Sequence, residues 1–359
     1  MTSRVQVAEE SRLHTTSILN IRRDEETNEW LFTHVFTEDL PLERKESMHR
    51  YIIKRLLFLI PTVLGVTLII FIVMSITPGN PGRMILGPNA NAAEVEAMNE
   101  ELGYNDPVVV RWFNYLKDIV TKGSFGQSYS TKLDVFDELW PRFLVTLRLA
   151  ILVLILSISI GVPLGILSAV KQNSLMDTIP TMIAFFLAAV PSFVVGILLM
   201  YIFALKLNWF PSFGLKSAKH YVLPVIAATI CELSAYLRFT KSSMLEAIRQ
   251  DYVRTARAKG VAERTVIWKH ALKNALLPVV TSIGMRFGCL LAGMVTTEQL
   301  FSIPGVGSLI VESISTKDEP MIIGCAVMVS ICFTLLMIGV DVIYAFIDPR
   351  IRAKYSKGG

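Results

Sequence analysis

Six stretches of mostly apolar residues, each long enough to cross a lipid bilayer as a helix, limit the folds open to this chain more than any other feature. A membrane-spanning helix needs about 20 consecutive apolar residues, because the hydrocarbon core of a bilayer is about 30 Å thick. Only 18% of the residues are charged, whereas soluble domains have about 25%. We therefore predict an all-α integral membrane protein with six spans, at about residues 52–76, 143–170, 178–205, 223–240, 278–295 and 320–347.

Charges at the ends of the spans predict the side of the membrane on which each connection lies. Lys54 and Arg55 are near the start of the first span, and cytoplasmic segments are enriched in Lys and Arg. Residues 77–141 have five Lys or Arg against nine Asp or Glu, as expected of an external segment. The tail 353–359 is basic. With six spans, both termini are therefore expected in the cytoplasm.

The first 47 residues differ in character from the transmembrane domain, residues 48–352. They contain ten Asp or Glu, six Lys or Arg, and no apolar core of a signal peptide. This polar, acidic composition favours a disordered cytoplasmic extension. The aromatic residues Trp30, Phe32 and Phe36 leave open a short amphipathic or docking segment.

One polar connection, residues 246–277, joins the fourth and fifth spans and is strongly basic. Ala256 and Gly260 lie four residues apart, so these small residues share one helical face and allow a partner to approach closely. Gly260 can end this helix, a second helix is expected over 263–275, and Pro278 suits the first turn of the fifth span. The pattern fits equally a helix that docks on a partner protein and an amphipathic helix on anionic lipid.

The residue pattern of this connection favours docking on a protein. The segment DYVRTARAKG, residues 251–260, followed nine residues later by HALKNALLP, resembles the EAA loop of ABC importer permeases. The form is that of the dipeptide/oligopeptide/nickel family. The blocks GVPLGILSAVKQNS, TTEQLFSIPGVGSLIVESI and DVIYAFIDPRIR also resemble this family, and the likeness covers about residues 48–352.

The resemblance implies a type I permease fold and a coupling loop that docks on a cytoplasmic ATPase. The implied partners are a second related permease, two ATPases that use ATP and Mg, and an external substrate-binding protein. Such systems lie in the bacterial or archaeal plasma membrane and import dipeptides, oligopeptides or a related solute such as nickel. The residues of this chain that match the coupling loop are Asp251, Tyr252, Arg254, Thr255, Ala256, Ala258, Lys259, Gly260, His270 and Asn274.

Two ionisable side chains lie within predicted spans, Glu232 in the fourth and Arg286 in the fifth. At the centre of a bilayer each costs at least about 2.5 kcal/mol, so such residues usually face a cavity or a partner. We predict that the two interact, either in the translocation path or as a structural ion pair. Glu298 is a third candidate for the path, because the resemblance implies a gate-adjacent external segment there.

Three residues depart from the usual pattern of the family. Asn80 stands where Asp is common, and Arg148 stands where the family usually has Glu or a neutral residue. Arg286 stands where Gln or another uncharged residue is usual. The two additional cations leave the identity of the cargo open.

Several classes of function are not indicated by the sequence. The chain has no Gly-x-x-x-x-Gly-Lys-Ser/Thr motif, so we do not expect it to hydrolyse ATP itself. No catalytic constellation stands out, and the four cysteines lack the spacing of metal ligands. The basic residues lie at span ends and in one connection, which predicts contact with membrane lipid and not with nucleic acid. We therefore expect neither a catalytic residue nor a bound cofactor.

Two alternative functions stay open from the sequence alone. The first is an ion-coupled secondary transporter that works alone, with Glu232 and Asp341 as proton sites. The second is a membrane scaffold that docks a partner but transports nothing.

Overall fold

The structure is a computed structural model that describes residues 18–23, 30–35 and 48–347 of the 359-residue chain. It separates into two units, one formed by residues 1–48 with 353–359 and the other by residues 49–352. Each unit is described by itself.

The N-terminal unit contains a β-hairpin within the extension that we expected to be disordered. Strand β1 (Ile18–Arg23) pairs antiparallel with β2 (Trp30–Val35), with Ile21 opposite Phe32. Both strands are rich in the β-branched and aromatic residues that favour strands. Trp30 and Phe32 lie in β2, and Phe36 lies outside the described residues.

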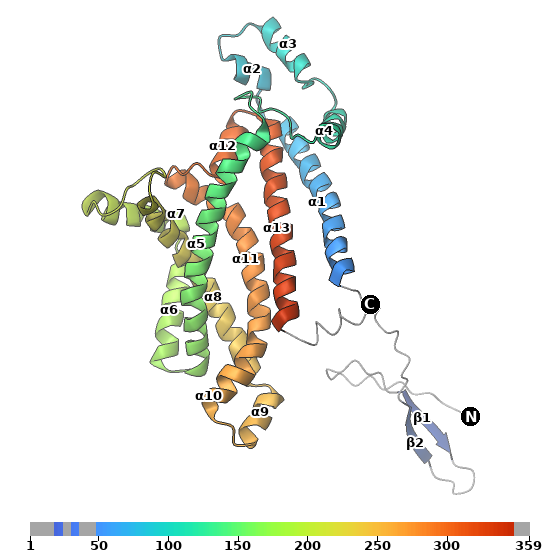
Figure 1. Cartoon of the computed structure of the whole chain (residues 1–359), viewed down its shortest axis with the longest axis vertical. Helices are drawn as coiled ribbons and strands as arrows, with labels where there is room; N and C mark the ends of the chain where they lie inside the picture. Colours follow the sequence, from blue (N-terminus) through green and yellow to red (C-terminus); the bar gives the residue numbers. More distant parts are fainter. Residues whose placement is uncertain (1–17, 24–29, 36–47, 348–359) are drawn as a thin grey trace. The chain divides into compact units, whose positions relative to one another are not determined.

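The second unit is all-α, which confirms the predicted fold class (Figure 1). Five of its helices are long and apolar enough to cross a membrane, or up to six spans result if one bent pair counts as a single span. The five are α1 (Met48–Ile76), α5 (Val135–Val170), α8 (Val222–Ile248), α11 (Leu272–Leu300) and α13 (Glu319–Ile347).

The bent pair occupies the predicted third span. Helix α6 (Leu175–Ala189) and helix α7 (Ser192–Leu199), which continues into a π-helical turn (Met200–Lys206), meet at an angle of 97°. The break lies at Pro191, because a proline pushes the residue before it out of the helical region, and Val190 is extended. Pro180 lies inside α6 without ending it.

The centre of the unit is the packing of α5 against α8. An added Cβ at Gly161 would lie 3.0 Å from the backbone oxygen of Leu233, and one at Gly165 would lie 2.7 Å from that of Leu237. Only glycine permits so close an approach of the two helices. Buried apolar side chains of α5, α8 and α11, among them Leu149, Leu223, Leu291 and Met294, complete this core.

Short helices lie at the two ends of the long ones (Figure 1). At one end are α2 (Pro81–Leu86), α3 (Ala92–Glu101), α4 (Val108–Lys122) and α12 (Val306–Ser315). At the other end are α9 (Asp251–Ala258) and α10 (Glu263–Thr265), and α1 begins and α13 ends toward this side. A 3-10 turn (Ala218–Tyr221) precedes α8, and a π-helical turn (Val266–Ala271) joins α10 to α11.

Candidate functional site

Helix α9 is the first part of the predicted coupling loop, and one side of it is buried. Val253 and Ala256 are buried, and they pack with Met244 of α8 and Ala271 of the π-helical turn. Asp251 supplies a negative charge in the first turn, where the helix dipole favours it. The helix is therefore held in place by a small apolar core that belongs to this chain.

The turn after α9 has the hydrogen bonds of a Schellman motif. The backbone N–H of Gly260 donates to Arg257 O at 2.9 Å, and that of Val261 donates to Ala256 O at 3.3 Å. This motif needs a residue with positive φ, and the φ of Gly260 is +76°. Across the turn, the Arg257 guanidinium donates two hydrogen bonds to the Glu263 carboxylate, at 3.0 and 2.7 Å.

The structure corrects the predicted role of Ala256. Its side chain is only 8% exposed and faces the core of its own chain, so the close approach that a small residue allows is used inside the protein. Gly260, by contrast, is exposed, and an added Cβ there would meet no atom within 4 Å. The remaining predicted residues of α9 and its end are exposed and could contact a partner: Asp251, Tyr252, Arg254, Thr255, Ala258 and Lys259.

The second half of the loop also differs from the prediction. Helix α10 runs through the π-helical turn directly into α11, so that no separate helix ends before the fifth span. Pro278 lies inside α11 and not in its first turn. Membrane helices tolerate a proline where neighbouring helices and local π-type adjustments satisfy the freed backbone groups. His270 is half-buried and Asn274 is exposed, and the Asn274 amide donates to His270 O at 3.3 Å.

Glu232 of α8 and Arg286 of α11 are in contact, as predicted. Arg286 Nη1 lies 3.5 Å from Glu232 Oε2, and the guanidinium carbon lies 5.9 Å from the centre of the Tyr236 ring. The side chains of Arg286 and Glu232 are 39% and 23% exposed. The pair therefore presents both charges on a surface of the spanning helices. The side chain of Asp341 lies outside the described part of the chain.

Glu298 has a different position from the one predicted. It lies in the last turns of α11 and is fully buried, so it does not face an open loop. Its carboxylate accepts hydrogen bonds from Thr146 Oγ1 at 2.6 Å and from the backbone N–H of Ser308 at 2.9 Å. An added Cβ at Gly307 would lie 2.9 Å from Glu298 Oε2, so the glycine makes room for this carboxylate. Glu298 therefore holds the start of α12 against α5.

A cluster of buried charges was not anticipated from the sequence. Lys317, Asp318 and Glu319, just before and at the start of α13, are each at most 2% exposed. Lys317 Nζ donates to Gly79 O at 2.8 Å and also bonds Thr77 O, and Glu319 forms an ion pair with Arg111 of α4. A run of three charges usually marks a solvated surface. No local signal reveals that α4 and the chain near Gly79 cover this run.

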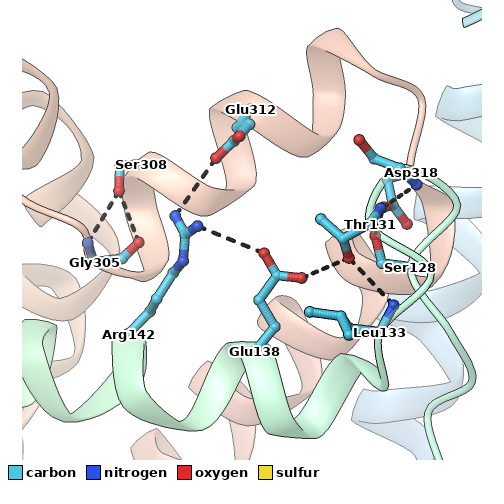
Figure 2. A network of polar contacts seen from close by, with 10 residues as sticks. Ser128, Thr131, Leu133, Glu138, Arg142, Gly305, Ser308, Glu312 and Asp318 are labelled. Carbon is cyan, nitrogen blue, oxygen red and sulfur yellow. Dashed lines mark hydrogen bonds and ion pairs between the residues drawn. The ribbon is translucent and has the colours of Figure 1, made fainter. Parts of the chain in front are cut away.

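A polar network lies near these buried charges and includes Thr131, Glu138, Arg142 and Glu312 (Figure 2). Arg142 lies 3.5 Å from both Glu138 of its own helix and Glu312 of α12. Glu138 in turn accepts a hydrogen bond from Thr131 Oγ1 at 2.9 Å. Asp318 accepts hydrogen bonds from Ser128 Oγ and from Ser130 N. The contacts of Asp318 join the loop before α5 to the start of α13, and those of Arg142 join α5 to the second half of α12.

The three departures from the usual pattern have different surroundings. Asn80 caps α2, because its side-chain oxygen accepts a hydrogen bond from the backbone N–H of Arg83 at 3.1 Å. Arg148 is exposed on α5, and Arg286 is the partner of Glu232. Within the described residues no group of three or more His, Cys, Asp or Glu is arranged to hold a metal ion.

Comparison with known proteins shows similarity over both parts of the transmembrane domain. Residues 161–353 match the family described as "Binding-protein-dependent transport system inner membrane component", and residues 48–150 match the N-terminal family of such membrane components. The glutathione transport system permease protein GsiC of Salmonella typhimurium is 40% identical over 307 residues, which cover 86% of this chain and 100% of the relative. GsiC of Escherichia coli K12 is 39% identical over the same lengths.

Two solved structures are similar at low identity. An inward-facing structure of the MetNI methionine ABC transporter is 16% identical with a TM-score of 0.48, and it covers 57% of this chain and 93% of the other. A crystal structure of an amino acid ABC transporter with histidines is 12% identical with a TM-score of 0.45, covering 64% of this chain and 97% of the other.

Proposed function

Because this chain belongs to the family of binding-protein-dependent transport system inner membrane components, the ABC importer permeases of the dipeptide, oligopeptide and nickel type, we propose that it is one of two related membrane subunits of an ATP-driven importer. The other proposed subunits are a second permease, two cytoplasmic ATPases that use ATP and Mg²⁺, and an external substrate-binding protein. In this proposal the chain lies in the inner membrane with both termini in the cytoplasm.

The observation that carries this proposal is the construction of α9. Its inner side is anchored by Val253 and Ala256, whereas the other residues of α9 that resemble the coupling loop are exposed. A helix with a rigid base and an unoccupied polar outer side is suited to dock on another protein. We propose that the outer side of α9 and the turn at Gly260 bind the ATPase.

The same construction offers a path for transmitting the ATPase's motion. The Arg257–Glu263 pair ties the end of α9 to α10, and α10 continues without a break into α11. Arg286 lies on α11 and is in contact with Glu232 of α8. A displacement of α9 is therefore passed along one continuous helix to the charged pair. We propose that closure of the ATPases moves the permeases between inward-open and outward-open states by this route.

For the cargo we propose peptide-like solutes, such as dipeptides, oligopeptides or glutathione. The relatives named above are glutathione permeases. A partly exposed carboxylate beside a partly exposed guanidinium is suited to a zwitterionic solute, because each charge of the solute then has a partner of opposite sign. Nickel or its chelates are a second candidate within the same family.

The experiment that tests the proposed function is transport by the reconstituted importer. We expect vesicles that contain this chain, its second permease and the ATPases to take up a labelled peptide only when the binding protein is outside and ATP is on the ATPase side. Uptake by this chain alone, driven by a proton gradient, would overturn the proposal in favour of a secondary transporter. An absence of uptake together with ATPase binding would favour a scaffold.

A double-mutant cycle tests the role of the charged pair in transport. We expect Glu232→Gln and Arg286→Gln each to reduce uptake, and the double variant to lose less than the sum, because either single change leaves one charge without its partner. A coupling of about 0.5–1 kcal/mol is reasonable for a pair that is partly open to solvent. Peptide uptake rates provide the measurement.

The exposed pair Lys122–Asp118, on α4, is a matched control for this cycle. Neutralising one or both of its members should leave uptake unchanged. Additive effects of Glu232→Gln and Arg286→Gln would show that their contact has no part in transport.

A further inference from the structure

A groove lies between the end of α5 and the start of the continuous helix formed by α10 and α11. Its volume is about 670 Å³. One wall is formed by the last turns of α5, including Leu167 and Val170, and the other by α10 and the π-helical turn, including Ile267. Most of the lining is apolar. This groove has no role in the function proposed above.

Two cations lie at this groove. Lys171 follows the last turn of α5, and Arg264 lies in α10, and both side chains are exposed. Within the described residues neither of them takes part in an ion pair. The one carboxylate at the groove, that of Glu263, is already engaged by two hydrogen bonds from Arg257. The groove therefore combines an apolar lining with an uncompensated positive charge.

Trp268 marks the level of the groove relative to a membrane. Its side chain is 58% exposed although it is large and apolar. Tryptophan is enriched at the boundary between the hydrocarbon core and water, where its ring lies among lipid headgroups. Leu167 and Val170 are also exposed, and they belong to the spanning helix α5. The apolar lining is thus continuous with a surface that faces lipid.

We propose that this groove binds one anionic phospholipid, with the phosphate held by Lys171 and Arg264 and an acyl chain along the apolar lining. Basic pockets between membrane helices bind anionic headgroups by such a combination of charge and apolar contact. A helix of a partner subunit would fill the apolar part but would leave both cations without counter-charges unless it carried matching acids. The anionic lipid satisfies both requirements with one molecule.

The location of the groove gives the lipid a structural consequence. Arg264 is adjacent to Glu263, and Glu263 is tied through Arg257 to the end of α9. A lipid in the groove therefore contacts the element that positions α9. The outer side of α9 stays free for a protein partner, so the two binding events use different surfaces of one loop.

Tryptophan quenching by brominated lipid tests the proposal on the full chain. Two sets of vesicles have the same mixture of phosphatidylglycerol and phosphatidylcholine, and the bromine is on the former in one set and on the latter in the other. The signal of Trp268 is the difference between the unchanged chain and Trp268→Phe. We expect phosphatidylglycerol to occupy the site with a preference of at least about fivefold, which is the factor given by one cation near an anionic headgroup.

Matched charge removal separates specific binding from general attraction. The double variant Lys171→Gln/Arg264→Gln should lose the preference. The double variant Arg249→Gln/Lys273→Gln, which removes two exposed cations of the same loop outside the groove, should keep it. Equal quenching by both labelled lipids would overturn the proposal by showing contact with bulk lipid only. Absence of quenching would overturn it by showing that protein covers Trp268, and a preference that survives loss of Lys171 and Arg264 would exclude these cations as the site.

Discussion

Replacing Gly260 with tryptophan is expected to abolish ATP-dependent uptake while leaving the chain inserted in the membrane. The φ of Gly260 is +76°, and a residue with a side chain costs about 1–2 kcal/mol in this conformation. No atom lies within 4 Å of an added Cβ, so the side chain does not clash inside the protein. It projects instead from the surface on which we propose that the ATPase docks. Uptake by reconstituted vesicles and co-purification of the ATPase provide the measurements.

Two control variants separate docking from backbone strain. Gly260→Asn should retain most of the uptake, because asparagine tolerates the left-handed conformation and adds little bulk. Gly123 ends α4 on the opposite side with a φ of +63° and also has open space around it. Gly123→Trp should therefore show the same strain without loss of ATPase binding. Normal uptake by Gly260→Trp would refute the docking assignment.

Breaking the Arg111–Glu319 pair is expected to have the largest effect on stability. The two side chains are 8% and 2% exposed, and removing one partner of a buried pair costs about 3–5 kcal/mol because the other charge is left without compensation. Glu319→Leu should therefore lower the free energy of unfolding strongly and loosen α4 from the start of α13. Thermal unfolding in detergent measures the first effect, and protease sensitivity of α4 measures the second.

The double variant Arg111→Met/Glu319→Leu should be more stable than Glu319→Leu alone. Replacing both members of a buried pair with apolar residues is often nearly neutral. The exposed pair Lys122–Asp118 offers the matched control, since its loss should cost at most about 0.5 kcal/mol. If the losses in the free energy of unfolding caused by the single changes at Arg111 and Glu319 were additive in the double variant, the two side chains would not be coupled, and the ion pair would not be what stabilises this contact.

In the coupling loop, the local sequence predicted where a helix ends but not which way its side chains face. The spacing of Ala256 and Gly260 correctly indicated a short helix that ends at a glycine, because backbone conformation at such a turn depends on the residue itself. The prediction that Ala256 lies on the side of the helix that a partner approaches was wrong. The direction in which Ala256 points depends on packing with Met244 of α8 and Ala271 of the π-helical turn, which belong to other elements of the chain.

Glu298 and Lys317 show the same limit for charged residues. Both occur near the end of a spanning helix, where an ionisable side chain is normally hydrated, and nothing in their immediate neighbours indicates burial. Their partners come from other parts of the chain, Thr146 for Glu298 and Gly79 for Lys317. The long separation between these contacts is the reason that only the folded chain reveals them.

The sequence by itself determined that the chain is an all-α membrane protein, because the need to satisfy every backbone group in lipid ties a long apolar stretch to a helix. It also determined the position of the loop between α8 and α11. Only the tertiary structure decided which side of α9 is exposed and that α10 and α11 form one helix. These features depend on side chains from separate helices that meet only after packing. Local composition carries no information about such distant partners.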